Sequence, residues 1–332
     1  MNVSASATYK TPELPLPGVL HAWDSTTTSA LLDQVDIGSF QPDKVFTRNN
    51  AEILTALATA AYAAPEDQEA HLDKQGAVRS FHFLDSANNE KLGIHAPDAG
   101  TQVSVVETDK ALLVAARGTQ PPWLGNLGKE DEFAWNDLGS DLDAVPVSNY
   151  DGSALVHEGF KRQADAIWDQ LSPYLQTAIA SHKEVHLAGH SLGAAVALEL
   201  ADRMHDQLGV LPESVMRMGG PDIGWGDEKK HLDQIGLSDH TINIVNGGDP
   251  VPLALPKGKA AGSEIYFDRN GAADTSGGSH VFDRVAIKAS DIVTGHALIP
   301  MYRHFPQFYA AGLQDPANGS ILDELGNRLN QA

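Results

Sequence analysis

The amino-acid sequence predicts an α/β fold, with a mostly parallel central sheet and helices on both of its faces. Three observations lead to this prediction. Short apolar runs typical of buried strands recur along the chain, and helical patterns separate several of them. Strands that alternate with helices form parallel sheets that are covered on both sides. In addition, the stretch HLAGHSLGAA (186–195) has the pattern of a strand that turns tightly into a helix.

The length and composition of the chain fit one large α/β domain. Its 332 residues are 42% hydrophobic, which is enough for a substantial core, and 20% charged. The sequence has no internal repeat and no second domain boundary. We expect an N-terminal extension over 1–45 that wraps on the domain, the α/β domain over 46–312 and a C-terminal tail over 313–332.

The charge and the residue usage exclude several classes of function. The net charge is −21, which argues against binding to nucleic acids and against electrostatic capture by anionic membranes. There is no cysteine, so disulfides, thiolate metal sites and a cysteine nucleophile are excluded. No apolar run approaches the length of a transmembrane segment, and the N-terminus does not resemble a signal peptide. We expect a soluble protein, either cytoplasmic or exported without a recognisable signal; its oligomeric state stays open.

The first elements are a helix followed by three strands. The run RNNAEILTALATAAYAA starts a helix, for which Asn49 and Glu52 have the spacing of a capping box. The run over 77–86 has the pattern of a strand. The run TQVSVVETDKALLVAARGT predicts two strands around a turn at Asp109 and Lys110.

The middle and the end of the chain continue the alternation. The run over 157–171 predicts a helix that Pro173 should end or kink. Four further apolar runs predict strands, namely VHLA, SVMRM, TINIVN and SEIYFD. A loop rich in Gly, Ser and Asp follows over 269–280. A closing helix is predicted near the end, with His296 at its mouth and His304 two turns inside it.

Ser191 is the candidate nucleophile. It lies at the predicted junction of a strand and a helix, in the sequence Gly189-His190-Ser191-Leu192-Gly193. A serine at such an elbow has a strained backbone that lifts its Oγ above the sheet, and small flanking residues let strand and helix approach. The helix N-terminus adds a positive dipole end where an oxyanion would form.

A serine nucleophile needs a base and an orienting acid, which in this type of site follow it in the order acid, then histidine. Asp249 is the preferred acid because it follows the buried-looking strand TINIVN, and Asp222 is the alternative. Three histidines come after Asp249: His280, His296 and His304. Position alone favours His296 and leaves the other two open.

Several motifs in order resemble the class 3, or fungal-type, lipase family of the α/β-hydrolase superfamily. They run from about residue 50 to residue 305 and are more specific together than the serine pentapeptide alone. The motifs are Arg117-Gly118-Thr119, the Trp-x-x-Asp-Leu segment from Trp135, HEGF (157–160), GHSLG (189–193), VNGGDPVP from Val245 and HALIPMY (296–302).

The resemblance implies an α/β-hydrolase fold and a role for each matching residue. Ser191 would be the nucleophile, His296 the base and Asp249 the acid. The backbone N–H groups of Thr119 and Leu192 would form the oxyanion hole. The segment near 120–136 would be a lid, because it carries apolar residues such as Trp123 and Leu124 among acidic ones.

No cofactor and no metal are expected. Acidic residues gather at Asp137, Asp141 and Asp143, and again at Asp268 and Asp274, but neither group matches an EF-hand loop. Calcium at one of these groups remains the alternative.

The function implied by the resemblance is hydrolysis of lipid esters at a lipid–water interface, with triacylglycerol as the preferred substrate. A phospholipase A1 and a short-chain esterase share the same residues and stay open as alternatives. So does an effector that attacks membrane lipids after delivery by a dedicated machine. A non-catalytic hydrolase-fold module that binds a lipid or a partner is less favoured, because all three catalytic positions are filled.

Overall fold

The computed structural model describes residues 25–88, 100–118, 145–249, 251–253, 260–268, 270–277 and 304–331. Within these ranges the fold is built on one eight-stranded sheet with the order β1-β2-β3-β6-β7-β8-β9-β10. Strands β3, β6, β7, β8 and β9 run parallel, whereas β1, β2 and β10 pair antiparallel at the two edges. The predicted mostly parallel sheet is confirmed.

Every strand predicted from an apolar run is present. The sheet strands are β1 (Ser80–Asp85), β2 (Gln102–Glu107), β3 (Ala111–Ala116), β6 (Glu184–His190), β7 (Ser214–Met218), β8 (Thr241–Asn246), β9 (Ser263–Phe267) and β10 (Ala273–Asp274). A separate hairpin is formed by β4 (Pro146–Ser148) and β5 (Leu155–His157). The turn between β2 and β3 lies at Asp109 and Lys110, as predicted.

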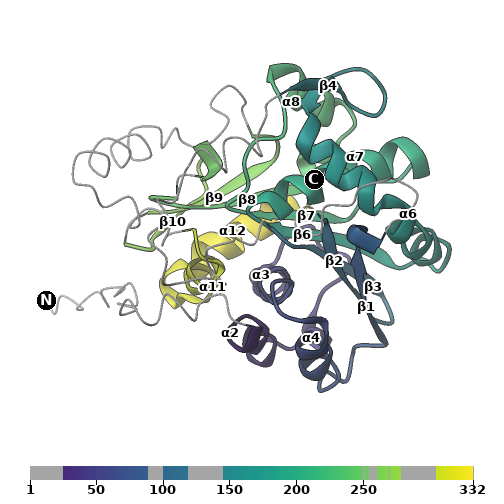
Figure 1. The fold of residues 1–332 in the computed structure, drawn as a ribbon. Coiled ribbons are helices and arrows are strands. Elements are labelled where there is room, and N and C mark those ends of the chain that lie inside the picture. Colours follow the sequence, from purple (N-terminus) through teal and green to yellow (C-terminus); the bar gives the residue numbers. More distant parts are fainter. Residues whose placement is uncertain are drawn as a thin grey trace, which may run out of the picture.

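Helices cover both faces of the sheet (Figure 1). One face packs against α3 (Arg48–Ala60), α11 (Pro306–Gln314) and α12 (Gly319–Leu329), with α2 (Ser25–Ser29) beside α3 and α4 (Pro65–Leu72) beside α2. The other face packs against α6 (Glu158–Ala180) and α7 (Leu192–Leu208). Helix α8 (Gly226–Gln234) contacts β5 of the hairpin. Short 3₁₀ turns lie at 30–34, 37–39, 86–88, 237–240, 251–253 and 316–318.

The sheet divides the apolar side chains between two cores. Along β3, Leu113 and Ala115 join the core under α3, whereas Leu112 and Val114 join the core under α6 and α7. This alternation follows from the two-residue period of a strand, which sends successive side chains to opposite faces. A strand buried on both sides therefore has a continuous apolar sequence, as in ALLVAA.

Helix α3 begins as predicted but with a different cap. Its N-cap is Thr47, whose side chain accepts a hydrogen bond from the backbone N–H of Asn50. Asn49 instead contacts Ser39 through its side chain, and Glu52 pairs with Arg48 one turn away. The predicted capping box of Asn49 and Glu52 is therefore wrong, because a threonine two residues earlier supplies the capping oxygen.

Helix α6 continues through Pro173, so the part of the prediction in which the proline ends the helix is wrong. It ends at Ala180, and Leu171, Leu175 and Ala178 are buried against the sheet and α7 on both sides of the proline. A proline inside a helix costs about 3 kcal/mol, whereas each buried leucine side chain contributes about 1.5–3 kcal/mol. Packing on either side therefore outweighs the lost backbone hydrogen bond.

The last residues form part of the packed domain rather than a tail. Leu322 and Leu325 of α12 belong to the core under α3, and the Asn330 side chain bonds both the N–H and the carbonyl of Phe46. Near the other end, Leu32 and Ile37 join the same core. The buried residues of α12 lie on one face of the helix, which explains why Leu322 and Leu325 pack into the core.

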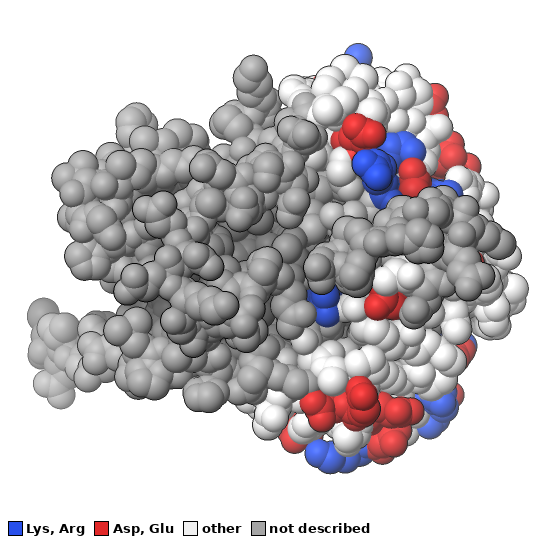
Figure 2. Space-filling model, in the orientation of Figure 1, with Lys and Arg blue, Asp and Glu red and all other residues white. Residues whose placement is uncertain are grey.

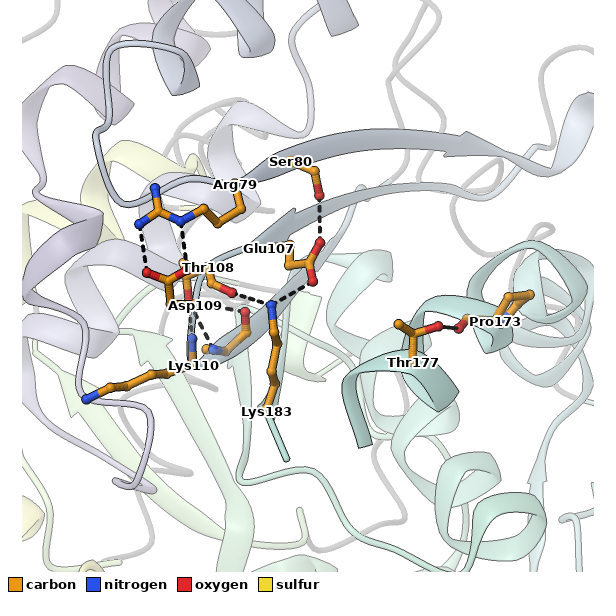
Figure 3. Close-up of polar contacts among 10 residues, drawn as sticks. Arg79, Ser80, Glu107, Thr108, Asp109, Lys110, Pro173, Thr177 and Lys183 are labelled. Carbon is orange, nitrogen blue, oxygen red and sulfur yellow. Dashed lines mark hydrogen bonds and ion pairs between the residues drawn. The ribbon is translucent and has the colours of Figure 1, made fainter. Parts of the chain in front are cut away.

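The described surface carries charges of both signs. On the face in Figure 2 acidic and basic side chains are interspersed, and acidic ones gather at the lower edge near α4. Figure 3 shows a group of ion pairs at the edge of the sheet formed by β1 and β2. Arg79 donates to both carboxylate oxygens of Asp109, and Lys183 donates to Glu107 and to the Thr108 carbonyl, each at 2.7 Å. These contacts fix the turn before β3 and the start of β6.

Candidate active site

Ser191 lies at a sharp turn between β6 and α7. Its backbone has φ 59° and ψ −129°, a region in which a non-glycine residue is strained by about 1–3 kcal/mol. The Ser191 N–H donates to the carbonyl of Met218 in β7 at 2.9 Å, which holds this conformation in place. The residue is 8% exposed. The predicted strand-to-helix elbow is confirmed.

Two glycines make this turn possible. A Cβ at Gly189 would overlap the carbonyl of Gly193, and a Cβ at Gly193 would overlap the carbonyl of Ala116 at the end of β3. Strand, turn and helix therefore approach more closely than side chains allow. This is the physical reason for glycine on both sides of the serine.

Asp249 lies just after β8, where the carboxyl ends of the parallel strands meet. Its Oδ2 accepts a hydrogen bond from Nδ1 of His304 at 2.8 Å and another from the hydroxyl of Tyr309. Its Oδ1 accepts from the backbone N–H of Val251 at 2.9 Å. Asp249 and His304 are each 3% exposed. Because Nδ1 of His304 donates to a carboxylate, its Nε2 is left as the proton acceptor.

The structure pairs Asp249 with His304, which sequence position had not favoured. His304 precedes α11 rather than lying inside a helix, since α11 begins at Pro306 with Phe305 as an extended N-cap. The predicted place of His304 two turns inside a helix is therefore wrong. His296 and His280 lie outside the described residues. The alternative acid Asp222 lies near Arg217, whose guanidinium it stabilises electrostatically.

His304 lies beside the serine elbow through its contact with His190. The two rings are 4.6 Å apart between centroids. Nε2 of His190 is 2.6 Å from the backbone carbonyl of His304, and Nδ1 of His190 is 2.9 Å from the hydroxyl of Tyr62. Burial, with a smaller effect of His304, holds the pKa of His190 well below its ordinary value, so its ring is neutral.

Part of the predicted oxyanion hole is described. Leu192 is the first residue of α7, so its backbone N–H is one of the first four of the helix, which have no intrahelical acceptor. Gly118 lies against the serine, because a Cβ built on it would be 3.0 Å from the Cβ of Ser191. Thr119 and the predicted lid near 120–136 lie outside the described residues.

A second serine, histidine and aspartate lie together away from this site. Nδ1 of His231 is 2.8 Å from the Ser153 hydroxyl, and Nε2 is 2.7 Å from the Asp202 carboxylate. The hydrogen bond to Asp202 raises the pKa of His231, with Asp151 also near. Ser153 lies on the turn between β4 and β5, without the strained backbone that Ser191 has at its strand-to-helix junction. These residues therefore clamp the β4–β5 turn to α7 and α8 rather than form a second nucleophilic site.

The acidic groups considered for calcium have other partners where they are described. The Asp268 carboxylate accepts from the N–H groups of Asn270 and Ala272, and that of Asp274 accepts from Ser276. Among the described residues, no three His, Cys, Asp or Glu side chains are grouped so that they could hold a metal ion. Asp137, Asp141 and Asp143 lie outside the described residues.

Sequence reasoning missed three residues of the site. Tyr62 and His190 are separated by 128 residues and Tyr309 and Asp249 by 60, so no local pattern connects them. The sequence did contain a signal for Tyr309. The run His304-Phe-Pro-Gln-Phe-Tyr309 is a histidine followed by a tyrosine, and it comes after a first run of this kind that starts at His296.

Comparisons with known proteins find similarity to lipases. The model of the family described as Lipase (class 3) matches residues 114–258, which include Ser191 and Asp249. Lipase ZK262.3 from Caenorhabditis elegans is 30% identical over 218 residues, which are 65% of this chain and 58% of that protein. The chain therefore spans less than two thirds of the length of this curated relative.

Solved structures show the same fold. The Rhizomucor miehei lipase in its propeptide complex superposes with a TM-score of 0.52 at 20% identity, over 68% of this chain and 70% of that one. The Rhizomucor miehei triacylglyceride lipase gives 0.52 at 19% identity, over 70% and 88%. The fold is thus the α/β-hydrolase fold, as predicted. None of the helices in the described ranges combines the length and the apolar character needed to cross a membrane.

Proposed function

Because this chain resembles the class 3 lipase family over residues 114–258, we propose that it is a member of that family and a serine hydrolase of carboxylic esters whose substrates are lipids. The observation that carries the proposal is the pairing of a strained Ser191 at the elbow with a buried Asp249–His304 hydrogen bond. A nucleophile, a base and an orienting carboxylate are the groups that acyl transfer through a serine requires.

In this proposal His304 takes the role of base that sequence position had given to His296. Asp249 accepts from Nδ1 of His304 at 2.8 Å, which fixes the tautomer that has a free Nε2. A base must accept the serine proton through that nitrogen, and the carboxylate stabilises the imidazolium that results. Tyr309 and the Val251 N–H hold the carboxylate in position.

The reaction proceeds in two transfers of the acyl group. The Oγ of Ser191 attacks the ester carbonyl while its proton passes to His304, and the alcohol leaves with that proton. Water then attacks the acyl-serine with His304 again as base, and the fatty acid leaves. The N–H of Leu192, together with that of Thr119, stabilises the negative oxygen in both steps.

Triacylglycerol is the substrate we favour. The structural neighbour from Rhizomucor miehei is a triacylglyceride lipase, which supports this choice. The segment near 120–136 mixes apolar and acidic residues, as expected of a lid that opens on a lipid–water interface. No cofactor takes part in the proposed steps, since the nucleophile, the base and the donors are all supplied by the chain.

The test is the release of fatty acid from a triglyceride dispersion, titrated across its solubility limit, with Ser191→Ala as the control. We expect a rate that climbs when droplets appear and that falls by at least about 10⁴-fold in the variant. Saturation on dissolved ester would indicate an esterase. Release only from phospholipid vesicles would indicate a phospholipase A1. No release from any of the three substrates would contradict the proposed activity.

A further inference from the structure

The residue before the nucleophile has two hydrogen bonds that join separate parts of the site. His190 is fully buried, at 0% exposure. Its Nε2 lies 2.6 Å from the carbonyl oxygen of His304, and its Nδ1 lies 2.9 Å from the hydroxyl of Tyr62. Tyr62 comes from the end of α3, and its ring stacks edge-on against that of His190.

The chemistry of the two partners fixes the tautomer of His190. A carbonyl oxygen accepts only, so Nε2 must carry the proton and donate it. The neutral Nδ1 is then an acceptor, and the Tyr62 hydroxyl donates to it. The Tyr62 oxygen in turn receives a hydrogen bond from the backbone of Gly118, beside Ser191. The hydrogen bonds therefore run in one direction: Gly118 donates to Tyr62, Tyr62 donates to His190, and His190 donates to the carbonyl of His304.

We infer that Tyr62 and His190 are positioning residues. They hold His304 in place, and through Gly118 they hold the chain that leads to the oxyanion hole. This inference rests on the proposed function. Among the described residues, the main chain of His304 is hydrogen-bonded to His190 and its ring to Asp249.

The hydroxyl of Tyr62 holds the His190 ring from its other side, because it donates to Nδ1. Without the hydroxyl, the Nδ1 acceptor is buried without its donor, and the ring is held by its bond to the carbonyl of His304 alone. The ring can then shift, and the carbonyl of His304 shifts with it. Displacement of a catalytic group by about 1 Å is enough to reduce a rate by about 10²-fold. The pair therefore acts on the rate through His304 rather than by contact with substrate.

The test compares four variants in the full chain with a soluble p-nitrophenyl ester. His190→Gln keeps an N–H donor near the position of Nε2, whereas His190→Met removes it at similar size. Tyr62→Phe removes one oxygen only. The matched control is His186→Met, four residues earlier on β6. His186 is also fully buried and also lies against a main-chain carbonyl, that of Pro42 at 3.0 Å.

We expect His190→Met to lower kcat by about 10²-fold with KM nearly unchanged, and His190→Gln to recover at least about tenfold of that loss. Tyr62→Phe should lower kcat by about tenfold. His186→Met should lower the melting temperature but leave kcat within about twofold. Equal losses in the Met and Gln variants, a loss confined to KM, or an unchanged kcat in Tyr62→Phe would overturn the inference.

A second readout separates this inference from the proposed function. The proton shared by His304 and Asp249 should give a downfield resonance in proton NMR, whether or not the protein hydrolyses an ester. We expect this resonance to move or vanish in His190→Met and Tyr62→Phe and to persist in His186→Met. If the wild type is inactive, only the proposed function fails. If the resonance is unchanged in both site variants, the positioning role fails.

Discussion

Asp249 has hydrogen-bond donors on both of its carboxylate oxygens, and they come from three places in the chain. His304 and Tyr309 donate to Oδ2 and the Val251 N–H to Oδ1. A buried carboxylate needs such partners, because an unpaired charge in the interior is costly. The full set of donors is therefore evidence that the carboxylate orients His304, and not that it is a loop residue of no consequence.

The choice between the two histidines is testable by replacement. His304→Ala should lower kcat by about 10⁴-fold, because it removes the proposed base. His296→Ala should leave kcat within about tenfold. Both are measured on a soluble ester, with circular dichroism to verify folding. The opposite ranking would return the role of base to His296.

At the scale of elements, α6 and α8 are held in place by contacts that local patterns do not encode. Helix α6 passes through Pro173 because Leu171 and Leu175 are buried on either side of it. Helix α8 carries His231, which connects the β4–β5 turn to Asp202 of α7. Neither feature has a signature within a window of a few residues.

The His231 clamp makes stability depend on pH. Asp202 raises the pKa of His231 above its ordinary value of 6.5, with smaller effects of Asp151 and Glu228 in the same direction and an opposing effect of burial. The clamp's contribution is complete below the unfolded pKa of about 6.5 and is lost as the pH rises through the folded pKa. The unfolding free energy of the wild type, measured with urea, should fall between pH 6 and pH 9. We expect this fall to be smaller in His231→Gln. An identical fall in the variant would contradict the clamp.

Helix α12 is expected to contribute to global stability. Leu322 is fully buried in the core under α3, so Leu322→Ala should cost about 2–5 kcal/mol of unfolding free energy. The control is Asp323→Ala, which changes an exposed residue of the same helix and should cost less than about 0.5 kcal/mol. Equal stability of the two variants in urea would mean that this segment is dispensable, as a tail would be.

At the scale of the whole molecule, one sheet separates two cores and brings together residues from many segments. The site draws Tyr62 from the turn after α3, His190 from the end of β6, Ser191 from the turn that follows, Asp249 from the loop after β8 and His304 from the segment before α11. The parallel strands deliver their carboxyl ends to one edge, which is where these groups meet. The residues of the site are therefore brought together by the order of the strands in the sheet more than by their order along the chain.

The interior also limits stability at alkaline pH. Burial raises the pKa of Glu228 to about 8, helped by Asp222 and Asp202 and opposed by Arg217. A carboxyl with a raised pKa binds its proton more tightly in the folded state. Its contribution to the unfolding free energy is therefore complete below about pH 4.5 and is lost as the pH rises to about 8. Glu228→Gln should therefore melt at a higher temperature than the wild type at pH 9, with little difference at pH 5. A variant that melts lower at pH 9 would show that the ionised carboxylate is needed.

The sequence by itself determined the strands and the elbow at Ser191, and it favoured Asp249 over Asp222 as the acid. Each of these depends on a local pattern: an apolar run, glycines on both sides of a serine, or an acid that follows a buried strand. The α/β class followed from the order of these patterns, and the motifs from Arg117 to Val245 carry the resemblance to the class 3 lipase family.

Only the tertiary structure decided which described histidine meets the acid, that α6 crosses Pro173 and that α12 packs into the core. Asp249 and His304 are 55 residues apart, and Tyr62 and His190 are 128 apart. A pattern of side chains along the chain reports which face of one element is apolar. It does not report which other element that face will meet, because the free energy of that contact depends on atoms brought together by the completed sheet.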